Sequence, residues 1–201
     1  MKLFIFIAMA CLFVNAAFAM PPRRTTAFPS LVQPYQGAYH LQLLPDAALN
    51  QQHANYLYSH IYYGYGLPNS GVTPSTGAPT VTAEHMQEGF NTNRDAPRFV
   101  YLGTNIEGDM MLAARMSPRP HADGSYIFAL LTARHRNVGA PQMVVHGFAK
   151  VGQGTSVLQA MDENKFVPRS AYDVPTIGDS MSIQKIFDRL TLVRNARPGG
   201  I

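Results

Sequence analysis

The chain contains a single cysteine, Cys11, and this cysteine lies inside an apolar run at the N-terminus. The run covers residues 3–14, follows the charge of Lys2 and precedes the small-residue pattern Ala-Phe-Ala at residues 17–19. A charge, a short apolar segment and small residues are the three parts of a secretory signal peptide, whereas a membrane span needs roughly 20 apolar residues. We therefore expect residues 1–19 to be a signal peptide and the protein to be secreted or periplasmic. The remaining domain must then be stabilised by packing, since it has no cysteine to form a disulfide bond.

The exported protein is expected to begin at Met20, because signal cleavage follows a small residue such as Ala19. Mass spectrometry of exported material measures this start directly, and the mature mass should lack Cys11. A mature mass that retains Cys11, or lipid attached there, would contradict the prediction.

The rest of the chain is long enough for one sizeable core and carries little net charge. Residues 20–34 are rich in Pro, Arg and Thr without periodicity, which predicts an extended lead-in, and residues 35–201 are expected to form a single globular domain. Without Lys2 the chain has fifteen basic and twelve acidic side chains, a net charge of about +3 that is too small and too dispersed for nucleic acid binding. No later segment is apolar for long enough to predict a transmembrane helix.

Helices are predicted at three places. Apolar and aromatic residues recur at helical spacing over residues 46–63 behind Pro45, and the pattern ends at the glycines around Tyr65. Residues 180–194 show the same periodicity behind an Asp179/Ser180 cap, and we expect this amphipathic C-terminal helix to pack on the domain. The composition of residues 106–116 favours a helix as well.

Strands are predicted for three segments that are rich in Val, Ile, Phe, Tyr and Leu and bounded by turn residues, at 98–102, 125–133 and 142–151. Residues 68–80 are turn formers almost without exception, which predicts a surface loop. Together these elements predict an α+β fold.

The sequence lacks the common catalytic motifs: it has no Gly-rich phosphate loop, no Gly-x-Ser-x-Gly elbow and no cysteine-containing metal motif. Seven histidines remain as candidates for chemistry. His53 and His60 share a helical face but lie two turns apart, too far for a shared metal ion without further ligands. His146 interrupts an apolar strand, and we expect it to be hydrogen-bonded or to face solvent. No metal cofactor is expected.

Several segments follow one another in the order found in a known fold. Residues 39–46, Tyr-His-Leu-Gln-Leu-Leu-Pro-Asp, place an aromatic-His pair just before a helix start. Residues 99–104, Phe-Val-Tyr-Leu-Gly-Thr, are followed by the apolar strand at 126–130 and, later, by Asp162-Glu163. This layout resembles the ADP-ribosyltransferase fold of bacterial toxin A subunits of the cholera and pertussis toxin type.

The resemblance implies ADP-ribosyltransferase-like split sheets around a cleft with peripheral helices, and NAD as the substrate. It implies that His40 contacts ribose or phosphate oxygens and that Tyr39 or Tyr101 stacks on nicotinamide, with a hydroxyl supplied by Tyr101 or Thr104. Glu163 would be the catalytic carboxylate, acting with His40, and would stabilise the positive charge that develops on the ribose.

One residue departs from the family's pattern, because Lys165 stands where the family has its second glutamate. A cation there opposes the charge that develops as nicotinamide leaves. Either Glu163 acts alone, as a transferase or an NAD glycohydrolase, or the site is inactive. The resemblance therefore implies NAD binding with weak or absent transfer activity, and a protein target or a binding subunit as partner.

A second hypothesis rests on residues 56–65, which contain five tyrosines in ten positions. Tyrosine offers a large amphipathic contact area, so this segment is typical of an interface. It is equally typical of the packed side of an amphipathic helix. On the interface hypothesis the protein is a non-catalytic secreted binding protein that uses a Tyr-rich surface.

Overall fold

The computed structural model describes residues 36–75, 81–117, 119–135, 139–170 and 172–196. These residues all belong to one compact unit, Val32–Ile201. The expected signal peptide and lead-in lie outside the described residues. None of the helices described combines the length and the apolar character that a membrane span requires.

Within the described residues the centre of the fold is a seven-stranded sheet in the order β1-β6-β5-β4-β3-β7, with β2 pairing separately with β6. β3 to β6 form an antiparallel meander, while β1 runs parallel to the first half of β6 and β2 antiparallel to its second half. The strands are β1 (His40–Leu43), β2 (Val72–Ser75), β3 (Phe99–Thr104), β4 (Met110–Arg115), β5 (Tyr126–Arg134), β6 (Gln142–Val151) and β7 (Ser180–Met181).

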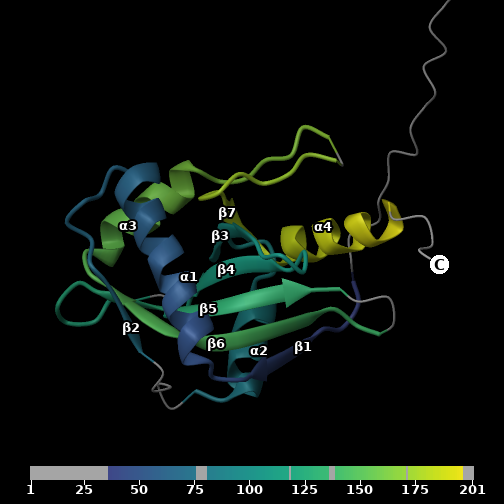
Figure 1. Cartoon of the computed structure of the whole chain (residues 1–201), viewed down its shortest axis with the longest axis horizontal. Coiled ribbons are helices and arrows are strands. Elements are labelled where there is room, and N and C mark those ends of the chain that lie inside the picture. The colour runs from purple at the N-terminus through teal and green to yellow at the C-terminus, as the bar shows by residue number, and fades with distance from the viewer. Residues whose placement is uncertain (1–35, 76–80, 118, 136–138, 171, 197–201) are drawn as a thin grey trace, which may run out of the picture. The chain divides into compact units, whose positions relative to one another are not determined.

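Helices cover both faces of this sheet (Figure 1). One apolar cluster joins the sheet to α1 and α3, and a second cluster on the opposite face joins it to α2 and α4. The helices are α1 (Ala47–Ser59), which continues as the π-helix η1 (His60–Gly64), α2 (Ala83–Thr92), α3 (Gly154–Glu163) and α4 (Ile183–Ala196). Because both faces are covered, the central strands are buried on both sides, and all but the last residue of β4 is buried.

The first predicted helix is confirmed, and its start has a local cause. The Asp46 carboxylate accepts hydrogen bonds from the backbone N–H groups of Ala48 and Leu49 at 2.9 and 3.0 Å, which caps α1. The C-terminal helix is also confirmed and packs on the domain, since Ile186 and Phe187 are fully buried. Its start differs from the prediction.

The start of α4 lies three residues later than expected. Ser180 belongs to β7, where it pairs with Val100 of β3. The hydroxyl of Ser182 accepts from the backbone N–H of Lys185 at 3.2 Å, so Ser182 caps the helix in place of the predicted pair.

The predicted helix at 106–116 is wrong, because this segment forms a turn followed by β4. The Asn105 side chain accepts from the backbone N–H groups of Glu107 and Asp109, and Gly108 has a φ of 85°, which reverses the chain. Residues 110–115 then pair with β3 and β5 on either side. Pairing within a buried sheet outweighs the helical preference of Met, Leu and Ala.

Three further elements differ from the predictions. The expected surface loop at 68–80 contains β2, whose Pro74 is tolerated because only one edge of this strand is paired. α2 and α3 were not predicted. Each is only ten residues long, shorter than the roughly 11–18 residues over which helical spacing is recognised in a sequence.

The α+β class is confirmed. The expected pair of split sheets is not what the described residues form, since all seven strands belong to one hydrogen-bonded sheet.

Candidate functional site

The residues implied by the resemblance lie in separate places. His40 is exposed on the edge strand β1, and three strands separate it from β3, a distance of roughly 19 Å at the usual strand spacing. Tyr39 is 2 % exposed and packs on Phe187 with ring centroids 4.7 Å apart. Glu163 is exposed at the end of α3, on the opposite face of the sheet from Tyr39. His40 pairs with Gln142 at the start of β6, whereas α3 follows the other end of that strand (Figure 1), so His40 and Glu163 do not share one cleft.

Tyr101 and Thr104 are the two implied residues, not adjacent in the chain, that contact each other. The hydroxyl groups of Tyr101 and Thr104 are 2.6 Å apart and hydrogen-bonded at the end of β3. Thr104 lines a cavity, whereas Tyr101 is 6 % exposed and packs in the core.

This cavity, which we call the histidine cleft, has a volume of about 420 Å³. It lies between α1, the turn that joins β3 to β4, and the strands β4, β5 and β6. Ten of the lining residues are polar or charged and three are apolar: Gln52, His53, Tyr56, Thr104, Asn105, Glu107, Asp109, Thr132, Arg134 and His146, with Leu49, Ile106 and Met111.

The cleft begins where the apolar face of the sheet ends. Side chains of a strand alternate between the two faces, so Leu130, Thr132 and Arg134 of β5 point to the same side as α1. Leu130 belongs to the apolar cluster under α1, and the next two positions on that side are polar. The helix α1 therefore covers apolar side chains with one half and the polar cleft with the other.

A β-bulge directs His146 into the cleft. The register of β5 and β6 pairs Leu130 with Gly147 and Leu131 with Val145, so His146 has no opposite residue. Its carbonyl oxygen instead accepts from the backbone N–H of Asp46, the residue that caps α1. Bulges commonly re-aim a side chain next to a functional site.

The close approach of α1 to β6 depends on the neighbouring glycine. A Cβ atom added at Gly147 would collide with the side chain of Asn50, a buried residue of α1 whose amide donates to the carbonyl of Ser75 at 3.3 Å. This approach places His53 of α1 beside His146, with ring centroids 5.4 Å apart.

His146 is neutral at physiological pH. Burial, and after it the nearby His53, lower the pKa of His146 to about 4. Its Nε2 lies 3.0 Å from the Thr132 hydroxyl oxygen in a buried hydrogen bond. Both Thr132 and His146 are thus held in place by each other.

One ring nitrogen of His53, Nε2, has no hydrogen-bond partner among the described residues. Its Nδ1 lies 2.7 Å from the carbonyl oxygen of Leu49, and since a carbonyl only accepts, Nδ1 carries the proton. Burial lowers the pKa of His53, so Nε2 is an unprotonated acceptor. This atom is buried and has no hydrogen-bond partner in the part of the chain that the structure describes.

Charged and aromatic side chains complete the wall. Arg134 Nη1 lies 4.0 Å from a carboxylate oxygen of Asp109, and Arg134 Nε donates to the side-chain oxygen of Gln142 at 3.1 Å. Tyr56 is 42 % exposed, and Ile106 projects fully into solvent from the turn. The cleft thus offers fixed hydrogen-bonding groups inside and apolar contact surface at its mouth.

The two histidines considered together in the sequence belong to different environments. His60 packs against Tyr65, with ring centroids 4.6 Å apart, and lies beneath Gly178, where any Cβ would overlap the imidazole. Within the described ranges no group of three or more His, Cys, Asp or Glu side chains is arranged to hold a metal ion.

Sequence reasoning missed His53, His146, Thr132 and Arg134 as a group. The available signal was the run of polar residues at alternate positions of β5 together with a histidine inside the apolar strand β6. Which residues would meet depends on the bulge, which no local pattern predicts.

Comparison with protein-family models, with curated proteins and with solved structures gives no match for this chain.

Proposed function

We propose that this protein binds a small, hydroxyl-rich ligand of the sugar or nucleoside class in the histidine cleft. The observation that carries the proposal is the buried Nε2 of His53, an acceptor in the wall of a cavity that has no partner among the described residues. An unpaired buried polar atom costs about 1–3 kcal/mol, and a ligand hydroxyl that donates to it removes that cost.

The other lining groups suit the same class of ligand. Hydroxyl groups both donate and accept, and the cleft supplies donors from Arg134 and Gln52 and acceptors from Asp109 and Glu107. Tyr56 offers a ring face at the mouth, where a sugar or base can stack. A cavity of about 420 Å³ falls within the usual range for small-molecule sites.

NAD belongs to this class through its two ribose units, and its binding remains part of the proposal. Thr104, implied by the resemblance as a nucleotide contact, lines the cleft. Transfer of ADP-ribose is not proposed, because His40 and Glu163 lie outside the cleft. The expected export of the protein is consistent with a role in capturing such a ligand outside the cytoplasm.

Calorimetric titration with ribose, methyl glucoside, NAD and ADP-ribose tests the proposal. At least one of these should bind, and His53→Phe should weaken the binding about tenfold, because it removes the acceptor and keeps a ring of similar size. No binding of any of the four at millimolar concentration would contradict the proposal.

Two equally exposed tyrosines distinguish binding in the cleft from binding elsewhere on the helix. Tyr56 and Tyr58 are both 42 % exposed on the same helix, yet only Tyr56 lines the cleft. Tyr56→Ala should lower the affinity for the ligand several-fold, whereas Tyr58→Ala should leave this affinity unchanged. Equal losses in the two variants would mean that the ligand lies elsewhere on the tyrosine surface.

A protein interface is the second candidate function. Four of the five tyrosines in residues 56–65 remain exposed, and Tyr63 is 80 % exposed. Tyr65 differs, because it is partly buried and donates to the carbonyl of Gly178 at 2.7 Å. If no small ligand binds the cleft, this exposed surface is the remaining candidate.

A further inference from the structure

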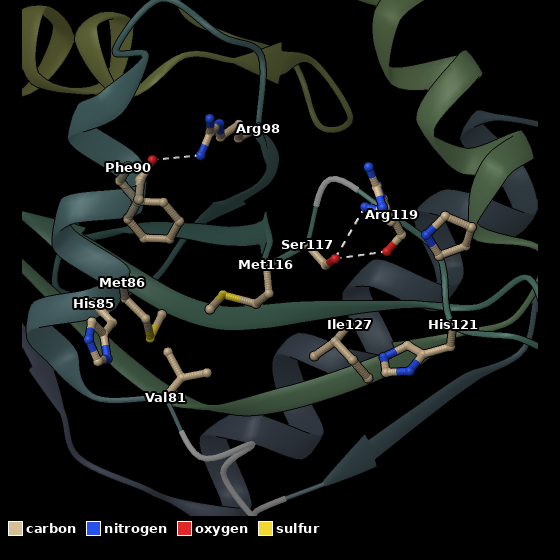
Figure 2. Close-up of a pocket in the computed structure, with 12 residues that line it drawn as sticks. Val81, His85, Met86, Phe90, Arg98, Met116, Ser117, Arg119, His121 and Ile127 are labelled. Carbon is tan, nitrogen blue, oxygen red and sulfur yellow. Dashed lines mark hydrogen bonds between the residues drawn. The ribbon is translucent and has the colours of Figure 1, made fainter.

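We propose that a second cavity, on the opposite face of the sheet, binds an amphipathic anion that consists of an oxyanion head on an apolar body. The cavity has a volume of about 450 Å³ and lies between α2, the start of β3 and the hairpin that joins β4 to β5 (Figure 2). We call it the α2 cavity. None of its lining residues belongs to the histidine cleft.

Most of the inner wall of the α2 cavity is apolar. Met86 and Phe90 are one turn apart on α2 and are 2 % and 3 % exposed, so their side chains form a fixed wall. Val81, Met116 and Ile127 line the rest of it and pack against the same core cluster. Methionine side chains adapt to ligands of irregular shape, which suits a flexible apolar chain.

Basic side chains lie at the edge of this apolar space, and no lining residue is acidic. The side chains are those of Arg98, Arg119, His85 and His121. Figure 2 shows Arg98 above Phe90, whereas His85 lies beside Met86 and Val81, and His121 lies beside Ile127. Arg98 is therefore the position at which we place the anionic end of the ligand.

Arg98 has unused hydrogen-bonding capacity. Its Nη1 donates to the carbonyl of Gly89 at 2.7 Å, which holds the guanidinium against α2. Its Nε is buried and has no partner among the described residues. Burial, and after it the charge of Arg115, lower the pKa of Arg98, so a second cation lies near the first. A carboxylate or phosphate oxygen would satisfy Nε and offset both charges.

Titration with decanoate and decyl phosphate, below their micelle concentrations, tests the anionic head. One or both should bind, and the preferred compound identifies the head group. Decanol and acetate should bind at least about tenfold more weakly, because decanol lacks the charge and acetate lacks the apolar body. Equal binding of decanol, or no binding of either anion, would overturn the proposal.

Two variants locate the ligand. A Cβ at Gly89 would meet no atom within 4 Å, so Gly89→Leu fills open space in the cavity. Gly89 lies inside α2, where leucine is the better helix former, so the melting temperature should stay the same or rise while decanoate binding is lost.

Arg98→Gln should lower the affinity for decanoate about tenfold and leave the affinity for decanol unchanged, because only the charged contact is removed. Arg169→Gln is the matched control, since it removes an exposed charge outside the cavity and should have no effect. Decanoate binding that persists unchanged in both Gly89→Leu and Arg98→Gln would overturn the assignment.

Discussion

Replacing Phe187 by alanine is expected to lower the free energy of unfolding by about 3–5 kcal/mol. Phe187 is fully buried on α4 and packs against Tyr39 at a ring-centroid distance of 4.7 Å. Tyr39 directly precedes the edge strand β1, and α4 follows β7 at the other end of the sheet. Removal of this ring leaves a cavity between two segments that lie far apart in the chain.

Urea denaturation measures the effect, and Val193→Ala is the matched control. Val193 lies on the same helix but is 38 % exposed, so its truncation should change stability by no more than about 0.5 kcal/mol. A loss below 1 kcal/mol for Phe187→Ala, with Val193→Ala equal to it, would mean that α4 does not pack as described.

Lowering the pH from 7 to about 4 is expected to destabilise the folded protein by about 3 kcal/mol through His146 alone. Well above pH 6.5 the imidazole is neutral in both states and contributes no dependence of stability on pH. Between pH 6.5 and 4 it is protonated in the unfolded chain but remains neutral in the folded one, where its pKa is about 4. The unfolded state then binds more protons, so stability falls as the pH falls.

The slope of stability against pH isolates this contribution from those of other groups. His146→Gln removes the titrating imidazole, and its stability should depend less steeply on pH between 6.5 and 4 than that of the wild type. Equal slopes for the wild type and His146→Gln would contradict a neutral, buried His146.

Local patterns predicted α1, α4, β3, β5 and β6 but not the meeting of the functional side chains. The helix at α1 and the strands β3, β5 and β6 were predicted, since their spacing, caps and turns act over a few residues. The segment 106–116 was predicted wrongly because its helix-forming residues lie between two strands, and the sequence near it does not show those neighbours. Thr104 was the one implied residue that the structure places in the proposed site.

Features that arise within a few residues of one another follow from the sequence alone. Asp46 caps α1 because its side chain reaches the N–H groups two and three positions on. The contact between His53 and His146, in contrast, depends on long-range packing. That contact requires a bulge in β6 and a glycine under α1, and both act through packing between segments far apart in the chain. Long-range packing also sets the low pKa of His146, because the burial that lowers it comes from neighbours on α1 and β5.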